Sequence, residues 1–280
     1  MDLANEYLKH STGIQYVVIT SLLNEFENDV SKMKGTVMDI GCGPGNNTKN
    51  LILPKISNDA VIVGFDISKN MVDSARILNS DEKRLTFEQM SIETTELPSE
   101  YIERFDHGIS FFCLHWIADL KCAFENIFKM LKPGGTFLSQ HILLFNGYNG
   151  YLKLSENSKY REYLKDARRF ITPLYFSKDP RGTLIKILQE VGFQVLHCSV
   201  REKITGYKSQ NDRKELFEAV NPFVTRMPDD VKNDFMDNLI QETFKEETVL
   251  FRKNDNPLEE DKIFDLYKLI MLHIKKPCVP

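Results

Sequence analysis

The residues Asp39-Ile40-Gly41-Cys42-Gly43-Pro44-Gly45 form the most informative stretch of the sequence. The stretch begins inside a short apolar run, 36–40, and is followed by a segment with helical character, 46–53. Glycines at this spacing let a strand turn sharply and bring backbone N–H groups close to a ligand. The helix that follows adds partial positive charge at its N-terminus. The stretch therefore predicts a strand–loop–helix unit that binds a small molecule.

Two kinds of cofactor use such a loop, and the acidic residues around it help to distinguish them. A dinucleotide prefers the spacing G-x-G-x-x-G, whereas here the third glycine comes one residue earlier and Pro44 intervenes. Asp66 closes the next apolar run, where a carboxylate can accept hydrogen bonds from the ribose hydroxyls of either cofactor. Asp39 would repel a pyrophosphate but suits S-adenosylmethionine, which carries an ammonium group and a sulfonium. The residues favour S-adenosylmethionine over NAD, with an ordinary glycine-rich turn as the alternative.

Apolar runs and helical segments alternate through the first half of the chain. Strands are expected at 36–40, 60–66, 85–90, 107–112 and 136–142, and helices at 14–29, 46–53, 68–79 and 121–131. The first of these helices should bury one face formed by Ile14, Val17, Val18, Leu22 and Phe26. Such alternation predicts an α/β fold with a mostly parallel sheet and right-handed crossovers.

The pattern changes after about residue 144. Helices are expected at 183–190, 214–220 and 231–248, and strands at 193–200 and 264–274, although the last run is long enough to be a helix. The second half should therefore complete the sheet and add helices over it.

The composition is that of an ordinary globular protein. The 280 residues are 42% hydrophobic and 27% charged, with 36 Lys plus Arg against 40 Asp plus Glu. A net charge of −4 gives no support to nucleic-acid binding. The sequence has no run long enough for a membrane span and no secretory signal at its start. Its five cysteines are scattered and odd in number, so a reduced, cytoplasmic protein without a structural metal is expected.

In this order, the motifs D-I-G-C-G-P-G, G-F-D-I-S and L-K-P-G-G-T-F-L resemble those of class I S-adenosylmethionine-dependent methyltransferases, a Rossmann-like family. The resemblance covers at least 35–142 and implies a seven-stranded, mostly parallel sheet whose last strand is antiparallel. Where the family often has an acid for the adenine amino group, this chain has Ser91 followed by Ile92. The expected cofactor-binding residues are Asp39, Gly41, Cys42, Gly43, Gly45, Asp66, Ile67, Ser91, Ile92 and Phe112.

The segment after the fourth predicted strand should face the methyl acceptor. It reads Phe112-Cys113-Leu114-His115-Trp116 and lacks the Asn/Asp-Pro-Pro-aromatic motif of methyltransferases that modify DNA bases and protein amides. Asn221-Pro222-Phe223 imitates that motif but lies far downstream, where a turn between helices is the simpler interpretation. His115 or the indole N–H of Trp116 could donate a hydrogen bond to an acceptor oxygen, and simple packing is the alternative for both.

Segments spread over most of the chain resemble the insect juvenile hormone acid O-methyltransferases. They are Ala4, Tyr7, Ser11 and Gln15 near the start, F-C-L-H-W-I, A-F-E-N-I-F-K-M-L, R-F-I-T-P-L-Y and V-N-P-F. The resemblance implies methylation of the carboxylate of farnesoic acid or juvenile hormone acid, with Gln15, His115 and Trp116 holding that carboxylate. Aromatic residues of the second half, among them Tyr148, Tyr151 and Phe223, would line an apolar tunnel for the tail, although each could equally be core.

The implied reaction requires no general acid or base from the protein. A carboxylic acid is ionised at pH 7 and needs no general base, so alignment and exclusion of water should suffice. We expect one methyltransferase domain over 1–280, with a helical lid at 1–34, a cofactor-binding core at 35–144 and an acceptor-binding cap at 145–280. A homodimer is compatible with the resemblance. The alternatives are a same-fold enzyme for another small acid or phenol, and a non-catalytic protein that binds S-adenosylmethionine.

Overall fold

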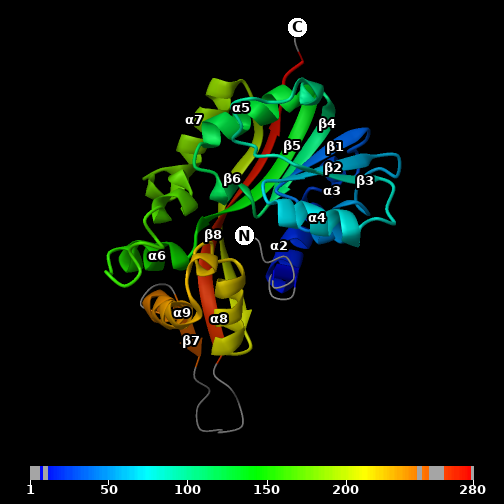
Figure 1. Ribbon diagram of the computed structural model, residues 1–280. Helices are drawn as coiled ribbons and strands as arrows, with labels where there is room; N and C mark the ends of the chain where they lie inside the picture. The colour runs from blue at the N-terminus through cyan, green and yellow to red at the C-terminus, as the bar shows by residue number, and fades with distance from the viewer. Residues whose placement is uncertain (1–6, 9–11, 245–247, 252–261, 279–280) are drawn as a thin grey trace.

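One twisted sheet organises the protein. The computed structural model describes residues 7–8, 12–244, 248–251 and 262–278. The sheet has eight strands: seven follow the order β3-β2-β1-β4-β5-β8-β6, and β7 pairs with β8 beside them (Figure 1). The strands are β1 (Thr36–Ile40), β2 (Val61–Asp66), β3 (Leu85–Gln89), β4 (Phe105–Phe111), β5 (Leu131–Leu144), β6 (Gln194–Tyr207), β7 (Thr248–Phe251) and β8 (Lys262–Lys275).

Strand β8 runs antiparallel to its neighbours and is inserted between β5 and β6. This confirms the expected antiparallel last strand and excludes a helix over 264–274. Its inner half pairs with β5 as far as the Leu144–Lys268 pair. Its outer half continues past the end of β5 and pairs only with β6 and β7. The outer parts of β6 and β8 therefore extend the sheet beyond the ends of its parallel strands.

Helices cover both faces of the sheet. Alternate residues of β8 show this: Ile270 and Leu272 pack in one apolar cluster, and Leu269 and Met271 pack in the other. The first cluster includes α5 (Leu120–Met130) and α7 (Pro180–Val191). The second includes α2 (Thr12–Glu25), α3 (Glu27–Val30), the π-helical turn η1 (Thr48–Ile52) and α4 (Lys69–Leu78). Burial on both sides explains why the central strands β1 and β2 are apolar over most of their length.

Local signals set several helix ends, with some differences from the predicted bounds. The Ser68 hydroxyl accepts a hydrogen bond from the Met71 amide and begins α4, and Gly192 ends α7 in the left-handed conformation. The predicted buried face of the first helix is partly wrong, because Val17 is 67% exposed and the neighbouring stripe through Val18 and Leu22 is buried. The last predicted helix is too long: α9 ends at Phe244, 245–247 lie outside the described residues, and 248 begins β7.

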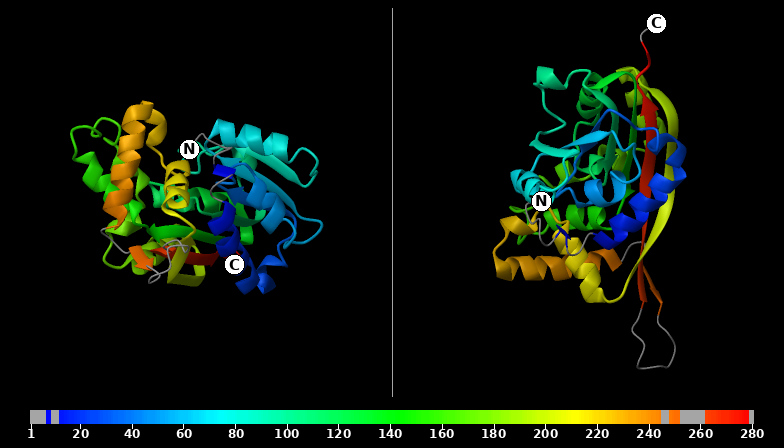
Figure 2. Two further views of the ribbon diagram at one scale, coloured as in Figure 1. Left: turned by 90° about the horizontal axis from the view of Figure 1, so that it is seen from below. Right: turned by 90° about the vertical axis from the view of Figure 1, so that its right-hand side faces the viewer.

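A third apolar cluster lies beyond the sheet, around the outer end of β8. It is built from α6 (Gly147–Ser155), α8 (Gln210–Ala219) and α9 (Asp229–Phe244), with the segment between 160 and 171. Figures 1 and 2 show these helices gathered next to the extended part of the sheet. The short 3₁₀ turns are η2 (Ser99–Tyr101), η3 (Leu114–Trp116), η4 (Ala167–Phe170), η5 (Pro173–Phe176) and η6 (Val224–Arg226).

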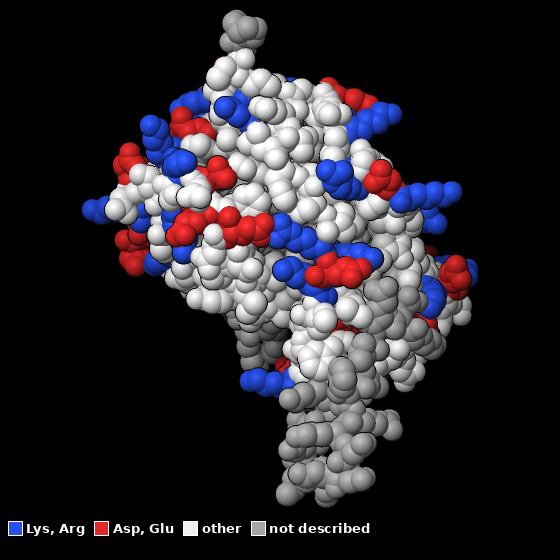
Figure 3. All heavy atoms as spheres, turned by 180° about the vertical axis from the view of Figure 1, so that it is seen from behind, with Lys and Arg blue, Asp and Glu red and all other residues white. Residues whose placement is uncertain are grey.

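Charges of both signs are interspersed on the face shown in Figure 3. Many of the protein's ion pairs join exposed side chains, such as Lys69 and Asp73 on α4. Within the described residues, no helix combines the length and the apolar character that a membrane crossing requires.

Candidate functional site: two adjoining cavities

The first cavity opens at the carboxyl ends of β1 and β2. It encloses about 1060 Å³ of space, its open mouth included, which is large enough for a nucleoside-sized ligand. The glycine bend after β1, the end of β2 and the segment after β3 all contribute to its wall. The structure thus brings together seven of the ten predicted cofactor-binding residues: Gly41, Gly43, Asp66, Ile67, Ser91, Ile92 and Phe112.

Asp66 is held rigidly at the edge of this cavity. One carboxylate oxygen accepts a hydrogen bond from the Gly43 amide at 3.0 Å, and the other accepts one from the Ser68 amide at 2.9 Å. Because the two backbone donors come from the glycine bend and from the start of α4, the carboxylate ties the two loops together. It has four acceptor positions in all, which is compatible with contacts to a diol.

The three glycines of the bend have different roles, although all have positive φ. A Cβ at Gly41 would lie 2.3 Å from Cys113, and one at Gly45 would lie 2.7 Å from the Phe87 ring. These two positions need glycine because the protein packs against them. At Gly43 the nearest atom would be Tyr7 Cε1 at 3.9 Å. The backbone of Gly43 therefore borders open space, as close approach by a ligand requires, and the site fits an S-adenosylmethionine-like molecule.

Asp39, Cys42 and Gly45 do not line the cavity. Asp39 is buried under the bend, where its carboxylate accepts a 2.6 Å hydrogen bond from the Thr48 hydroxyl. Burial raises the pKa of Asp39 to about 7, with the nearby charge of Asp66 adding to the effect and Thr48 opposing it. Asp39 was expected among the cofactor-binding residues, whereas the structure places it beneath the loop. Asp39 can therefore act on a ligand only through its charge.

The segment after β3 forms another wall. The Ser91 hydroxyl accepts a hydrogen bond from the Glu93 amide at 3.3 Å and keeps its own proton for donation. One oxygen of the Glu93 carboxylate, Oε1, accepts hydrogen bonds from the amides of Ala118 and Asp119. Ile67 is 62% exposed despite its apolar side chain. An apolar surface beside a small hydroxyl suits the face and edge of a purine ring.

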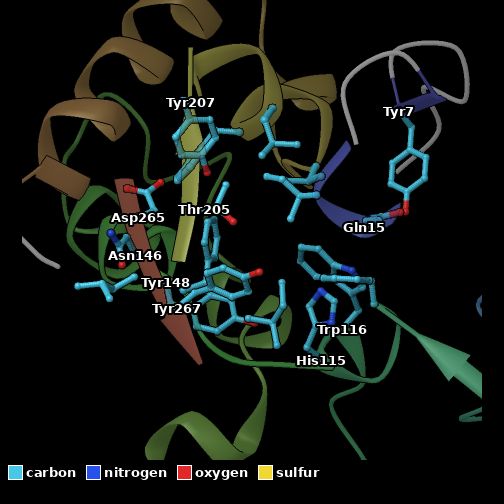
Figure 4. A pocket seen from close by; sticks show the side chains of 18 residues that line it. Tyr7, Gln15, His115, Trp116, Asn146, Tyr148, Thr205, Tyr207, Asp265 and Tyr267 are labelled. Atoms are coloured by element: carbon cyan, nitrogen blue, oxygen red, sulfur yellow. The ribbon is translucent and has the colours of Figure 1, made fainter. Parts of the chain in front are cut away.

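The second cavity adjoins the first and encloses about 870 Å³, its open mouth included. Figure 4 shows Gln15, His115 and Trp116 on one side of it and the outer parts of β6 and β8 on the other. Three side chains line both cavities: Tyr7, Phe112 and Trp116. A ligand in one cavity would therefore meet a ligand in the other at these residues.

Phe112 has an unusual backbone at this junction. Its φ is 51°, in the left-handed region that bulky side chains rarely adopt. Its amide donates a hydrogen bond to the Gln140 carbonyl, which helps to fix it at the end of β4. Strained residues of this kind concentrate at functional sites.

His115 is buried and uncharged. Burial, with a smaller contribution from His141, holds the pKa of His115 well below its ordinary value. Its Nδ1 has no hydrogen-bond partner among the described residues, and its ring lies 4.6 Å from the Trp116 ring. A neutral imidazole can offer one N–H to an acceptor oxygen.

Two residues that sequence reasoning did not place in the site fix the orientation of Gln15. Its Oε1 accepts a hydrogen bond from Asn47 at 3.1 Å, and its Nε2 donates one to the Tyr7 hydroxyl at 2.6 Å. Asn47 thereby turns the amide nitrogen toward Tyr7 and the cavity. The only sequence feature that pointed to Tyr7 was the family resemblance, which includes this residue. No sequence feature pointed to Asn47.

The predicted acceptor-binding aromatics separate into two groups. Tyr148 lines the second cavity and is 1% exposed, and its hydroxyl has no partner among the described residues. Tyr151 and Phe223 line neither cavity. Their rings pack edge to face at 5.1 Å inside the third apolar cluster, so the structure assigns them to the core. The presence of aromatic residues in the second half of the sequence could not show which of them line the cavity and which belong to the core.

Among the described residues that line the second cavity there is no lysine or arginine, and the one carboxylate among them, Asp265, is paired with the buried Arg213 at 2.8 Å. The polar groups that remain there are neutral. In the described ranges there is no cluster of three His, Cys, Asp or Glu side chains arranged to hold a metal ion.

Comparison with known proteins agrees with this architecture. Residues 31–218 match a family model described as a methyltransferase domain. In fold, the chain is similar to phosphoethanolamine N-methyltransferase 2 of Haemonchus contortus bound to S-adenosylhomocysteine (TM-score 0.54, 17% identity, 94% of this chain and 53% of that one). It is also similar to the YcgJ protein of Bacillus subtilis (TM-score 0.57, 14% identity, 92% and 98% of the two chains). The protein is an S-adenosylmethionine-dependent methyltransferase with a Rossmann-like fold.

Two curated relatives extend over nearly the whole chain. Juvenile hormone acid O-methyltransferase of Drosophila melanogaster is 31% identical and covers 96% of this chain and 90% of the relative. The enzyme of the same name from Bombyx mori is 32% identical and covers 100% and 99%. The chain belongs to the juvenile hormone acid O-methyltransferase family, and it is an O-methyltransferase that uses S-adenosylmethionine.

Proposed function

We propose that the protein methylates the carboxylate of a small apolar acid, namely farnesoic acid or juvenile hormone acid, and produces the methyl ester. The observation that carries the proposal is the junction of the two cavities at Tyr7, Phe112 and Trp116. One cavity has the features that an S-adenosylmethionine site needs, and the other has apolar walls with neutral donors at one end. The names of the two nearly full-length relatives support an acid as acceptor.

S-adenosylmethionine held by Gly43 and Asp66 in the first cavity would supply an electrophilic methyl group. We propose that Gln15, His115 and Trp116 hold the acceptor carboxylate at the junction of the two cavities. One C–O bond forms as the C–S bond breaks, and the bonding electron pair leaves with sulfur. No proton moves, because the acid is already ionised at pH 7.

Neutral donors suit this reaction better than a cation would. A lysine or arginine beside the carboxylate would stabilise its charge in the ground state, where that charge is largest, and so would lower its reactivity. Gln15, Trp116 and an uncharged His115 can orient the oxygen with weaker stabilisation. His115 is the donor whose charge state matters most, and its burial keeps it neutral.

The three parts of the chain have separate roles in this proposal. Residues 1–34 supply Tyr7 and Gln15 and act as a lid over both ligands. Residues 35–144 hold the cofactor. Residues 145–280 complete the sheet and enclose the acceptor tail. A cytoplasmic location is proposed with it, since all five cysteines are free thiols.

The test is product analysis by mass spectrometry with S-adenosylmethionine and a panel of acceptors: farnesoic acid, its terminal epoxide, a straight-chain fatty acid and a phenol of similar size. Methyl esters of the isoprenoid acids, formed faster than the other products, are expected. Preference for the fatty acid or the phenol would indicate a same-fold enzyme with another substrate. Binding of S-adenosylhomocysteine without turnover of any acceptor would indicate a non-catalytic member.

A further inference from the structure

A row of four polar side chains joins the cofactor loop to the acceptor cavity. It begins at Asn46 and Asn47, the two residues that follow the glycine bend. It ends at Gln15 and Tyr7, which line the second cavity. Figure 4 shows the Tyr7 hydroxyl directed at the Gln15 amide at the edge of that cavity. Two segments that are distant in the sequence therefore share one hydrogen-bond network.

The hydrogen bonds of this row all run in one direction. Asn46 Nδ2 donates to Asn47 Oδ1 at 3.2 Å, and Asn47 Nδ2 donates to Gln15 Oε1 at 3.1 Å. Gln15 Nε2 then donates to the Tyr7 hydroxyl oxygen at 2.6 Å. A side-chain amide has its acceptor on one branch and its donors on the other, so the orientation of each amide fixes that of the next. Asn46 and Asn47 therefore decide which branch of Gln15 carries the N–H groups.

The environment of Gln15 makes this orientation difficult to reverse. Gln15 is only 8% exposed, so water cannot easily replace the network. If the amide turned over while Asn47 kept its place, the Nε2 donors would face the donors of Asn47 and one buried polar group would lose its partner, which is costly. In the observed orientation the bond to Tyr7 uses one N–H of Nε2. The second N–H is left for a ligand.

The branch that Gln15 presents matters for the head group of the acceptor. A carboxylate has only hydrogen-bond acceptors, whereas a primary amide has both donors and acceptors. A carboxylate is therefore bound by the N–H groups of Gln15 and repelled by its oxygen. A neutral amide of the same size can bind either branch. The direction of the row thus favours an anionic head group without placing a positive charge beside it.

We propose that Asn46 and Asn47 are positioning residues that make the acceptor site selective for a carboxylate through the orientation they impose on Gln15. Neither is among the described residues that line the second cavity. This inference rests on the proposed function and concerns the specificity of the same site. Hydrogen bonds to a charged group are stronger than those between neutral groups. Reversal of the Gln15 amide should therefore lower the affinity for a carboxylate about tenfold to a hundredfold and change that for a neutral amide far less.

The test measures the binding of farnesoic acid and of its primary amide to the intact chain by calorimetry, with S-adenosylhomocysteine bound. Asn47→Asp keeps the size of the side chain but removes the donor, so Gln15 should turn its N–H groups toward the new carboxylate. The ratio of the two dissociation constants, amide over acid, should then fall at least tenfold, because only the acid loses its donor. A general disturbance of the site would weaken both ligands alike and leave this ratio unchanged.

Two controls separate the orientation of the amide from the added charge. Asn50→Asp adds the same charge at an exposed asparagine of η1 and should keep the wild-type ratio. In a Gln15→Met background no amide can turn, so Asn47→Asp should change the ratio at least fivefold less than it does in the wild type. Asn46→Asp removes the donor one step earlier and should shift the ratio in the same direction, and it replaces Asn47→Asp if that variant does not fold.

A folded Asn47→Asp variant whose ratio stays within threefold of the wild-type ratio would overturn the inference. An equally large change in the Gln15→Met background would overturn it as well, because the added charge alone would then explain the result. In both cases the proposed carboxyl methylation stands. If the wild type binds neither farnesoic acid nor its amide, the proposed function fails and the inference fails with it. Melting curves show which variants are folded.

Discussion

Replacing Asp66 by asparagine tests the cofactor site most directly. The two carboxylate oxygens accept hydrogen bonds from the Gly43 and Ser68 amides. An asparagine has one oxygen and one NH₂ group, so one of these two amides would face another donor. Losing that hydrogen bond costs about 1–3 kcal/mol, and losing a ribose hydrogen bond to a charged acceptor costs about 1.5–3 kcal/mol.

The lost internal hydrogen bond weakens the free and the bound protein alike, so the ribose contact sets the change in binding free energy, about 1.5–3 kcal/mol, or roughly tenfold to 150-fold in Kd. Isothermal titration calorimetry with S-adenosylhomocysteine measures it. Asp73→Asn is the matched control, because Asp73 is an exposed acid on α4 that pairs with Lys69 and lines neither cavity. Its Kd should equal that of the wild type. A folded Asp66→Asn variant that binds within threefold of the wild type would refute the assignment of Asp66 to the ribose.

Four further predictions address the rest of the site and the core. Trp116→Phe, which keeps a ring but removes the indole N–H, should lower kcat/KM for farnesoic acid about tenfold to a hundredfold. An unchanged kcat/KM would show that the indole N–H does not bind the carboxylate. Because His115 is neutral, kcat at saturating cofactor should not change between pH 6.5 and 8.5. A change in kcat centred near the ordinary histidine pKa of about 6.5, present in the wild type and absent in His115→Asn, would contradict this. Burial raises the pKa of Asp39 from 3.8 to about 7, so the folded state progressively loses stability as pH rises from 3.8 to about 7. Asp39→Asn should therefore raise the melting temperature more at pH 8 than at pH 5, while weakening binding of S-adenosylmethionine at pH 8. Phe223→Ala should destabilise the protein by about 3–5 kcal/mol in urea unfolding, whereas a lining residue would affect KM with little change in stability.

The cofactor half of the site was predictable from the sequence because its residues are local to strand ends. A strand that ends in Gly41 and another that ends in Asp66 must place these residues at one edge of a parallel sheet, as the structure confirms. The sequence could not show that Asp39 turns away beneath the loop, because that depends on the hydroxyl of Thr48 nine residues later. The direction of a side chain at a strand end depends on hydrogen-bond partners of this kind, which come from other parts of the chain.

The acceptor half was less predictable because its residues come from distant segments. Thr205 and Tyr267 line the same cavity because β8 is inserted next to β6, and no spacing in the sequence predicts this pairing of strands. Tyr148 and Tyr151 are three residues apart on α6, yet one lines the cavity and the other is core. Helix periodicity puts both on one side of the helix. Their surroundings differ because the Tyr148 ring packs against Tyr175 and the Tyr151 ring packs against Phe223.

The central position of β8 bears on how the protein is made. Strand β6 is synthesised well before β8, yet its sheet partner is β8. As domains fold progressively during synthesis, the nucleotide-binding strands can pair while translation continues. The wall formed by β6 must wait until residues 262–275 have emerged from the ribosome. During that interval β6 has no partner strand on either edge, so we expect the wall of the acceptor cavity to be the last part of the protein to form.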